Sequence, residues 1–585
     1  MQKDTYQLIS ELMNDPILER RTCPISKTEF PIYQSDHNLL QKLSPTIANK
    51  QYILPYPTKS PEERARQRYT WRNIHKFFKS TCALSGKDII SLYPRDSSYT
   101  VYHQDIRFSD QRNPLDYSRE ISFSQPFFIQ FDALLKAVPR MALVNTNSTN
   151  CHYANYIKDG KNCYMTSVTY YDCENLAYCV WIMDGKDSVD CLQCRHIQYC
   201  IQCTDSNHIF RCAYLHESNN CTDVYFSTNL NNCDHCFLCT NLSNKSYHIQ
   251  NQSYTKEQYH EKIQQIKSDP HRYQNCIKSF EQILQDRTVK ATSNKNCQKC
   301  IGNQINNSEN ARFVFGADNI QDGAYIVGEN LKDCMDMTGW TVELWYLSTN
   351  IWLDGSSHII GSVSILNSHH MYYCDNCYDN CSYCFGCIGL RNKSYCIFNK
   401  QYTKQERETL VDKIINHMIT TGEWWEFFPI SMSPFAYNNS RAQQRFPSTK
   451  KEAETKWYPR YDHDHSPYPW PWYIPKSINQ YDTSVVWETQ ADKNKQELLG
   501  NIVKCKKSQR WMRIISIELD IYTKLWIPLP EIHPDLRYEN RYARLAPKTL
   551  NLHTCAQSHK TILSVYPPTK SNVISEEIYN QKIYG

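Results

Sequence analysis

The chain has 585 residues, with 65 Lys and Arg against 60 Asp and Glu, for a formal net charge of +5. This length predicts several structural units with a sizeable core, and so mild a charge excludes a polycationic nucleic-acid coat. No stretch approaches the roughly 18 to 20 apolar residues of a membrane span, and the first residues carry acids where a signal peptide would be apolar. We therefore expect a soluble, cytoplasmic chain with no membrane partner.

The 27 cysteines are expected as thiols, metal ligands or small buried groups rather than disulfides, because the cytosol keeps thiols reduced. The sequence has no GxGxxG, Walker, GxSxG or HExxH motif, so the common nucleotide, hydrolase and zinc-protease sites lack their minimal residues. It names no reaction, and the balance favours a protein that is not an enzyme.

Residues 1–125 are predicted to form a module with two C-x-x-S turns, which begin at Cys23 and Cys82. C-x-x-C is the knuckle of zinc ribbons, in which two thiolates on one tight turn hold a tetrahedral ion. Serine is a poor zinc ligand, so we interpret this part as a degenerate zinc-ribbon-like (treble-clef or knuckle) module whose metal has been replaced by packing.

Within this module, residues 59–79 interleave basic and aromatic side chains, as single-stranded RNA and phosphate binding require. The alternative is an amphipathic helix with a solvated basic face and aromatics in the core. The candidate nucleic-acid-binding residues here are Arg64, Arg66, Arg68, Tyr69, Trp71, Arg72, Lys76 and Lys79.

After a predicted connecting helix (126–149), the middle of the chain is duplicated at an offset of 148: NKSYHIQNQSYTKEQ, from Asn244, returns as NKSYCIFNKQYTKQE, from Asn392. Each copy ends in a short strand and a helix that starts with a capping box, Thr255 with Gln258 and Thr403 with Glu406. We predict two β-solenoid halves with capping helices, 150–275 and 296–420, joined by a helical linker at 276–295.

Cysteines in this middle region recur at steps of nine residues, often after Asn or Asp, which tolerate left-handed turns. We expect about two such steps per coil, with cysteine packing inside narrow coils. The alternative is a zinc or iron–sulfur site. The candidate metal ligands are Cys191, Cys194, Cys200, Cys203, Cys233, Cys236, Cys239, Cys374, Cys377, Cys381, Cys384 and Cys387.

A Pro- and aromatic-rich linker is predicted at 421–480, followed by a second degenerate zinc-ribbon-like module at 481–585. TCALSGKDIISLYP, from Thr81, reappears as TCAQSHKTILSVYP, from Thr554, an offset of 473. The same offset places Arg64 and Arg68 on Arg537 and Arg541, which therefore join the nucleic-acid candidates. The alternative for Arg537 and Arg541 is a structural role in ion pairs.

The knuckle modules, the SGK-x-I-I-S-x-Y strand, the Asn/Cys/Tyr-rich middle and LRNKSYCIFNKQYTKQE together resemble a large family of uncharacterised cysteine-rich proteins predicted in genome-reduced bacterial lineages. The resemblance covers nearly the whole chain and implies ribbon-like folds at both ends. This chain departs from that pattern at Ser26 and Ser508, and at residues 54–57, where a further cysteine pair would stand. The family brings no established activity.

The first hypothesis for function is a non-enzymatic binding or scaffold protein that holds RNA, a ribonucleoprotein or a protein through its paired end modules. The second is a zinc, iron–sulfur or thiol-redox protein that uses the solenoid cysteines. The third is a solenoid carbohydrate-active enzyme, which would need paired carboxylates on the coils. We expect no small-molecule substrate and no cofactor, with zinc as the alternative.

Overall fold

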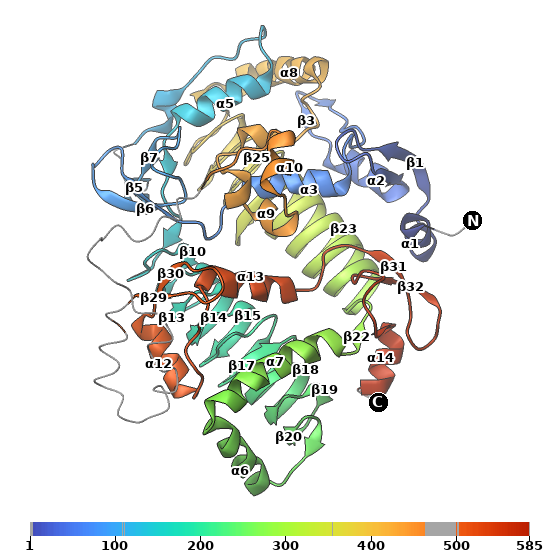
Figure 1. Cartoon of the computed structure of the whole chain (residues 1–585). Coiled ribbons are helices and arrows are strands. Elements are labelled where there is room, and N and C mark those ends of the chain that lie inside the picture. The colour runs from blue at the N-terminus through green and yellow to red at the C-terminus, as the bar shows by residue number, and fades with distance from the viewer. Residues whose placement is uncertain are drawn as a thin grey trace.

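The computed structural model describes residues 4–107, 109, 112–353, 355–462, 499 and 502–583. The chain is mainly β with helices on its outside, as the sequence predicts, and its central strands form two stacks of coils (Figure 1). Residues 463–498, which include the end of the predicted linker and the start of the last predicted module, lie outside the described residues.

The first stack runs from Asn145 to Ser253 and consists of strands that pair in parallel with the next coil. The register advances by 12 residues at most pairings, as in Val180 with Leu192 and Ile197 with Ile209, and by 13 from Ser167 to Val180. The expected coil of two nine-residue steps is therefore wrong. The strands are β9 Asn145–Thr146, β10 Asn155–Lys158, β11 Gly160–Lys161, β12 Ser167–Tyr170, β13 Cys173–Ala177, β14 Val180–Val189, β15 Leu192–Gln198, β16 Asn207–Phe210, β17 Ala213–His216, β18 Asn219–Phe237, β19 Thr240–Ser243, β20 Ser246–Ile249 and β21 Gln252–Ser253.

A left-handed residue stands at about every third position of the first stack, for example Asp187, Asp190, Gln193 and His196. Each such residue bends the extended chain, and about four bends per 12 residues return it to the point above its start. Asn and Asp accept this conformation at low cost because their short side chains bond locally. The frequent Asn and Asp residues are therefore corners of the coils.

The nine-residue cysteine step is a diagonal of this 12-residue coil. The Cys203 thiol lies 3.5 Å from the Ile201 carbonyl oxygen and 3.6 Å from that of Cys212, and the Cys212 thiol lies 3.6 Å from the Cys221 carbonyl oxygen. The position directly above a residue in the next coil is 12 residues further along the chain. The neighbouring side of that coil is three residues earlier, which gives a step of nine. Cysteine recurs at this step because each thiol faces a carbonyl of the neighbouring coil.

The second stack runs from Asn294 to Gln401 and begins with β23, Asn294–Leu353. A straight strand of that length would span roughly 200 Å, and Figure 1 instead shows β23 wound into successive coils. Its coils are less even: the register advances by 14 residues from Glu343 to Ser357, by 12 from Ser357 to His369 and by 13 from His369 to Ser382. The remaining strands are β24 Ser357–Ile360, β25 His369–Tyr372, β26 Ser382–Phe385, β27 Cys396–Ile397 and β28 Lys400–Gln401.

Each stack ends in a helix that starts with the predicted capping box. In α6 (Lys256–Lys267) and α8 (Lys404–Thr421), the cap threonine accepts from the backbone N–H three residues on, and that residue's side chain returns to the cap. The helix α7 (Pro270–Asp286) then packs along the first stack (Figure 1). After α8 come the 3-10 turns η2 Ile430–Met432 and η3 Tyr437–Asn439 and the helices α9 Arg441–Arg445 and α10 Lys450–Thr455.

The N-terminal part contains two hairpins whose turns start at Cys23 and Cys82. Between the hairpins, α2 and α3 pack against β23 of the second stack. Its elements are α1 Thr5–Met13, β1 Ile17–Thr22, β2 Glu29–Tyr33, α2 Gln34–Leu43, β3 Thr46–Ile47, β4 Lys50–Gln51, α3 Pro61–Thr70, β5 Phe78–Thr81, β6 Asp88–Ser91, β7 Val101–Tyr102, α4 Gln104–Arg107, η1 Pro114–Tyr117, α5 Phe127–Ala137 and β8 Arg140–Met141.

The C-terminal part has the same plan, with hairpins at Cys505 and Cys555, but its helices α12 and α13 pack against the first stack. Its elements are β29 Ile502–Lys504, β30 Trp511–Arg513, α12 Ser516–Lys524, α13 Pro534–Arg544, β31 Asn551–Thr554, β32 Thr561–Ser564, β33 Val573–Ile574 and α14 Glu576–Ile583. In Figure 1, α3 lies on the upper coils and α13 on the lower ones.

Each end of the chain therefore contacts both stacks. The N-terminal part places α3 on the second stack, while the Ser167 hydroxyl of the first stack donates to the Ile74 carbonyl oxygen at 2.8 Å. The C-terminal part places α13 on the first stack, and its β33 pairs with β22 (Val289–Lys290). The backbone N–H of Asn294, the first residue of the second stack, donates to the Glu576 carboxylate at 3.4 Å. This crossed arrangement ties the two stacks together.

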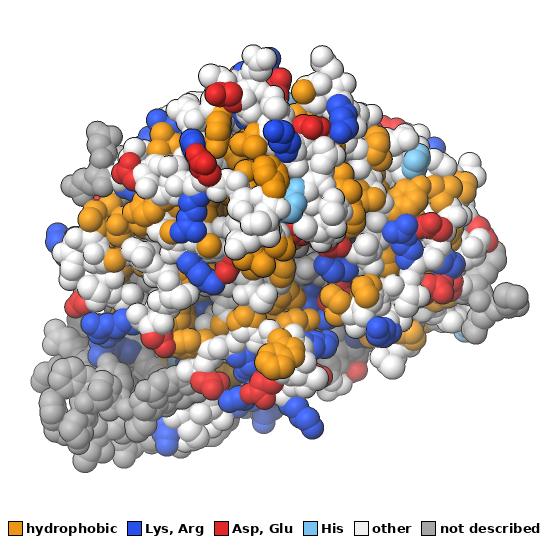
Figure 2. All heavy atoms as spheres, turned by 90° about the horizontal axis from the view of Figure 1, so that it is seen from above, with side chains coloured by type: hydrophobic (Ala, Val, Ile, Leu, Met, Phe, Trp, Pro, Cys, Tyr) orange, Lys and Arg blue, Asp and Glu red, His pale blue; other side chains and the backbone are white. Residues whose placement is uncertain are grey.

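The surface carries no single dominant charge on the face seen in Figure 2, where Lys and Arg alternate with Asp and Glu and apolar side chains lie between them. Within the described part of the chain, none of the helices combines the length and the apolar character needed to cross a membrane.

Candidate ligand-binding cleft

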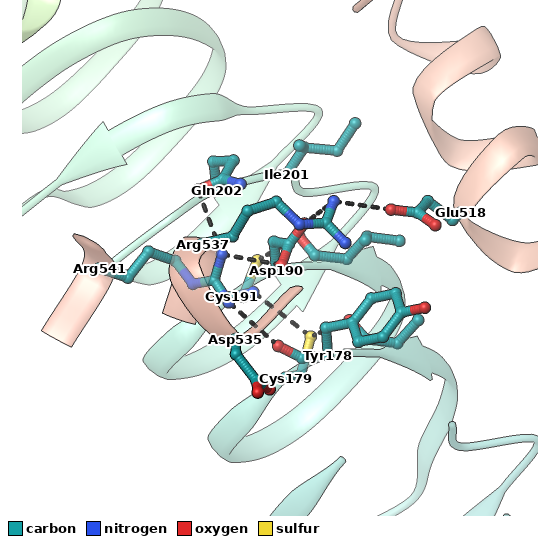
Figure 3. A network of polar contacts seen from close by, with 12 residues as sticks. Tyr178, Cys179, Asp190, Cys191, Ile201, Gln202, Glu518, Asp535, Arg537 and Arg541 are labelled. Carbon is teal, nitrogen blue, oxygen red and sulfur yellow. Dashed lines mark hydrogen bonds and ion pairs between the residues drawn. The ribbon is translucent and has the colours of Figure 1, made fainter. Parts of the chain in front are cut away.

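Arg537 and Arg541, on successive turns of α13, reach into the first stack and share the carboxylate of Asp190 (Figure 3). Their Nη1 atoms lie 2.7 and 2.8 Å from the Asp190 oxygens, and all three side chains are at most 2% exposed. Glu518 of α12 adds a second carboxylate, 2.7 Å from Arg537 Nη1. These two arginines thus form the ion pairs that were the alternative to nucleic-acid contact.

Arg64 and Arg68 of α3 make the matching contact with the second stack. Arg64 Nε lies 2.7 Å and Arg68 Nη1 3.1 Å from the two oxygens of Asp336 on β23. All three side chains are at most 5% exposed. Spacing of four residues places both guanidinium groups on one face of the helix, and this face is turned inward.

The other basic and aromatic candidates lie in different settings. Arg66 pairs with Glu63 at 2.7 Å, Lys76 lies 3.6 Å from an oxygen of Asp535, and Lys79 is exposed on β5. Trp71 is buried against Phe428, with ring centroids 4.8 Å apart. The candidates therefore do not form one surface. RNA binding through them as a set stays a prediction.

A cavity of about 670 Å³ lies between the two stacks. The first stack contributes Tyr170 and Trp181 to its lining, and the second stack contributes Trp340. The indoles of Trp181 and Trp340 lie 5.0 Å apart between ring centroids, so aromatic side chains from both stacks meet here. Further lining comes from Tyr69 and Arg72 at the end of α3, Arg441 of α9 and Lys548 after α13. We call this cavity the cleft.

Arg72 is the nucleic-acid candidate that lines the cleft without a charged partner. It is 1% exposed, and none of its three guanidinium nitrogens has a hydrogen-bond partner among the described residues. Its guanidinium lies over the indole of Trp181, 5.7 Å from the ring centroid. A buried cation without a partner is costly.

Further cations gather around Tyr69 at one side of the cleft. Arg445 Nη1 lies 3.4 Å from the Tyr69 hydroxyl and Nη2 donates to the Lys548 carbonyl oxygen. Burial raises the pKa of Tyr69, but Arg445 and Lys548 outweigh it and lower that pKa to about 7. Burial lowers the pKa of Lys548 to about 8, although the Tyr69 charge opposes this shift. This side of the cleft favours negative charge.

Acidic groups also line the cleft, and the charges of Asp205 and Lys548 act on each other there. Arg287 Nη1 lies 2.6 Å from Glu217, and Arg195 pairs with Glu329 across the two stacks. Asp205 accepts from the Gln304 amide, and burial raises the pKa of its carboxyl. Among the described residues, three lining cations (Arg72, Arg441 and Lys548) and two lining acids (Asp205 and Asp318) form no ion pair, so cations are in excess.

The candidate metal cysteines are at most 1% exposed and lie inside the coils. Burial raises the pKa of Cys194 and Cys203 well above the ordinary thiol value, whereas the hydrogen bond with Cys236 lowers the pKa of Cys233 to about 7. In the second stack burial likewise raises the pKa of Cys377, to about 12. Among the residues that the structure describes, no group of three or more His, Cys, Asp or Glu side chains is placed to hold a metal ion. Metal loading of these cysteines stays a prediction.

The four C-x-x-S turns share one conformation. In each, the cysteine carbonyl oxygen accepts from the N–H four residues on, and that residue is left-handed, as at Lys27 and Gln509. The Cys505 sulfur accepts the backbone N–H of Ser508 at 3.3 Å and of His533 at 3.2 Å. Cys23 and Cys82 belong to separate hydrophobic clusters, so the turns of this module do not share a core.

Sequence reasoning missed Trp181, Trp340, Arg441 and Lys548. They stand far apart in the chain and outside any motif, and only the packing of the stacks brings them to Arg72. One signal was present: at the offset of 473, Arg72 corresponds to Leu545. Because the C-terminal part has leucine at this position, the charge of Arg72 is not part of the structural role that the two helices share.

No protein-family model matches this chain, and a search of curated proteins gives no match. Among solved structures, the chain is similar to a candidate acetyltransferase from Desulfovibrio desulfuricans G20, at 10% identity, over 48% of this chain and 69% of that one. The TM-score of that similarity is 0.09, too low to carry an argument about fold or activity.

Proposed function

We propose that this chain is a non-enzymatic binding protein that holds single-stranded RNA between its two stacks. In this account the stacks are the halves of a duplicated β-solenoid, and the two ends are degenerate zinc-ribbon-like modules that each contact both halves. Solenoids present extended surfaces between and along their coils, and here the crossed end modules fix the distance between two such surfaces.

The chemistry of the cleft supports RNA as the partner. Trp181, Trp340 and Tyr170 offer aromatic faces, and Arg72, Arg441 and Lys548 offer positive charge. Single-stranded nucleic acids bind by stacking of bases on aromatic side chains and by pairing of phosphates with cations. The cleft volume, about 670 Å³, lies within the usual range for ligand sites and fits a nucleotide-sized segment.

The observation that carries this proposal is the origin of the cleft lining. Residues from both stacks, from α3 and from the C-terminal part all face one cavity. A cavity built from every part of the chain exists only when the crossed assembly is complete. A partner bound there therefore engages the whole molecule.

Fluorescence anisotropy with a labelled oligouridylate tests the proposal. We expect saturable binding whose affinity falls with salt at a log–log slope near −2, since each phosphate contact to a single strand contributes about −0.7. Three lining cations, Arg72, Arg441 and Lys548, form no ion pair among the described residues. The matched variant is Trp340→Ala, which removes one aromatic face and should weaken binding by about 1–3 kcal/mol. Absence of binding at low salt, or binding that Trp340→Ala leaves unchanged, would contradict the proposal.

A further inference from the structure

Arg72 and Arg441 form a pair of like charges at one wall of the cleft. The backbone N–H of Arg441 donates to the Arg72 carbonyl oxygen at 2.7 Å, which fixes the two residues together. Both guanidinium groups lie over Trp181, at 5.7 and 5.3 Å from the ring centroid. One indole thus carries two cations.

No carboxylate of the described residues forms an ion pair with either guanidinium. The titratable groups that act on Arg72 include Arg441 and the tyrosines 69, 156 and 170. Those that act on Arg441 include Arg72, His75, Lys548 and the tyrosines 69, 538 and 542. Burial, and then the charge of Arg441, lower the pKa of Arg72 to about 10, so it remains a cation at neutral pH. The pair lacks a carboxylate partner, and Tyr69, whose pKa is lowered to about 7, is the neighbour that supplies negative charge.

The matching helix shows that the fold itself does not need a cation at this position. At the offset of 473, α13 supplies Arg537 and Arg541 where α3 supplies Arg64 and Arg68, and then Leu545 where α3 is followed by Arg72. Leu545 packs beside the buried cluster that contains Tyr538. An apolar side chain thus satisfies the same position in the other module.

We propose that Arg72 and Arg441 form a phosphate-binding site in the cleft, with the guanidinium groups as donors and the Trp181 indole as the wall behind them. Guanidinium binds phosphate oxygens through paired N–H groups. The charge of two cations neutralises either the dianionic phosphate of a nucleoside monophosphate or two successive phosphodiester groups of RNA. This inference names the anchoring contact within the proposed function and rests on it for the RNA ligand.

The test measures binding by titration calorimetry with three probes: inorganic phosphate, uridine monophosphate and oligouridylate. The variant is Arg72→Leu, which copies Leu545 and should fold because it removes an unpaired buried charge. The matched control is Arg66→Leu, on the same helix but outside the cleft lining and paired with Glu63. We expect Arg72→Leu to weaken binding of every probe about 10- to 100-fold, as loss of hydrogen bonds to a charged group predicts, and Arg66→Leu to leave it unchanged.

The three probes separate this inference from the proposed function. Loss of binding in Arg72→Leu for phosphate and the mononucleotide, without any binding of oligouridylate, would support the phosphate site and contradict the RNA function. Oligouridylate binding that Arg72→Leu leaves unchanged would support the RNA function and overturn the phosphate site. Binding of none of the three probes to the unaltered protein would overturn both.

Discussion

The helices α3 and α13 occupy matching positions in the two end modules, and they differ in the residue that follows the shared arginines. Both insert two arginines, four residues apart, onto a buried aspartate of a stack: Asp336 for α3 and Asp190 for α13. Beyond these pairs, α13 ends with Leu545 and α3 is followed by Arg72. The arginine–aspartate pairs, which both helices make, attach the helices to the stacks. Arg72, which α13 replaces by Leu545, lines the cleft.

The comparison separates structural from ligand-binding arginines by their partners. A buried guanidinium that shares a carboxylate stabilises docking only as long as that carboxylate is present, since either charge alone is costly in the interior. A buried guanidinium without a partner destabilises the free protein and gains its partner on binding. Four predictions follow, from the largest expected effect to the smallest, and the first three use this distinction.

Asp336→Ala should have the largest effect, because it leaves both Arg64 and Arg68 buried without a carboxylate. We expect a loss of about 5 kcal/mol in the free energy of unfolding, at the upper end for a broken buried pair. Chemical denaturation measures it. The control is Glu343→Ala on the same strand, whose pair with Lys332 is half exposed and should contribute less than about 1 kcal/mol. Equal effects of the two variants would contradict the account.

Asp190→Ala should cost less, about 3 kcal/mol, because Arg537 keeps Glu518 as its partner and only Arg541 is left without a carboxylate. The same denaturation series checks it, with Asp184→Ala as the control, since the pair of Asp184 with His196 is exposed. A larger loss for Asp190→Ala than for Asp336→Ala would reverse the predicted order of the two modules.

Arg72→Leu should stabilise the protein in the absence of ligand by about 1–3 kcal/mol, the cost of an unsatisfied buried polar group. It makes the end of α3 resemble that of α13. A rise in the midpoint of thermal unfolding measures the effect, in a buffer free of phosphate. Destabilisation would show that Arg72 has a structural role that Leu545 does not share.

Tyr69→Phe should change how stability depends on pH. The pKa of Tyr69 is lowered to about 7 in the folded protein, so the folded state binds fewer protons than the unfolded state between pH 7 and the ordinary tyrosine value of about 10. Stability gained from Tyr69 is therefore fully present above about pH 10 and lost as pH falls through about 7, and amounts to about 1 kcal/mol at pH 8.

We expect Tyr69→Phe to flatten the rise in unfolding free energy from pH 7 to 9, measured by denaturant titration at each pH. The control is Tyr542→Phe, at the matching position of the other module. An unchanged slope in Tyr69→Phe would contradict the charged environment described for this side of the cleft.

The sequence predicts the mainly β character, the capped helices and the correspondence of Arg64 and Arg68 with Arg537 and Arg541. It does not predict the 12-residue coil, because the visible cysteine period of nine is a diagonal between neighbouring coils. The burial of the arginines was also hidden, since Asp336 and Asp190 lie in distant stacks without any motif. The cleft depends on packing between the stacks, so Trp340 and Arg441 could not be connected with Arg72 from spacing.

The most direct test of the central claim is ultraviolet cross-linking of bound oligouridylate, with the linked residues identified by mass spectrometry. The account predicts cross-links at Tyr170, Trp181 and Trp340 in the cleft. The second stack also carries a ladder of stacked rings, in which His370 lies 4.5 Å from Tyr383 and Tyr383 lies 5.4 Å from Tyr395 between centroids. Cross-links confined to that ladder would place the partner outside the cleft and contradict the account.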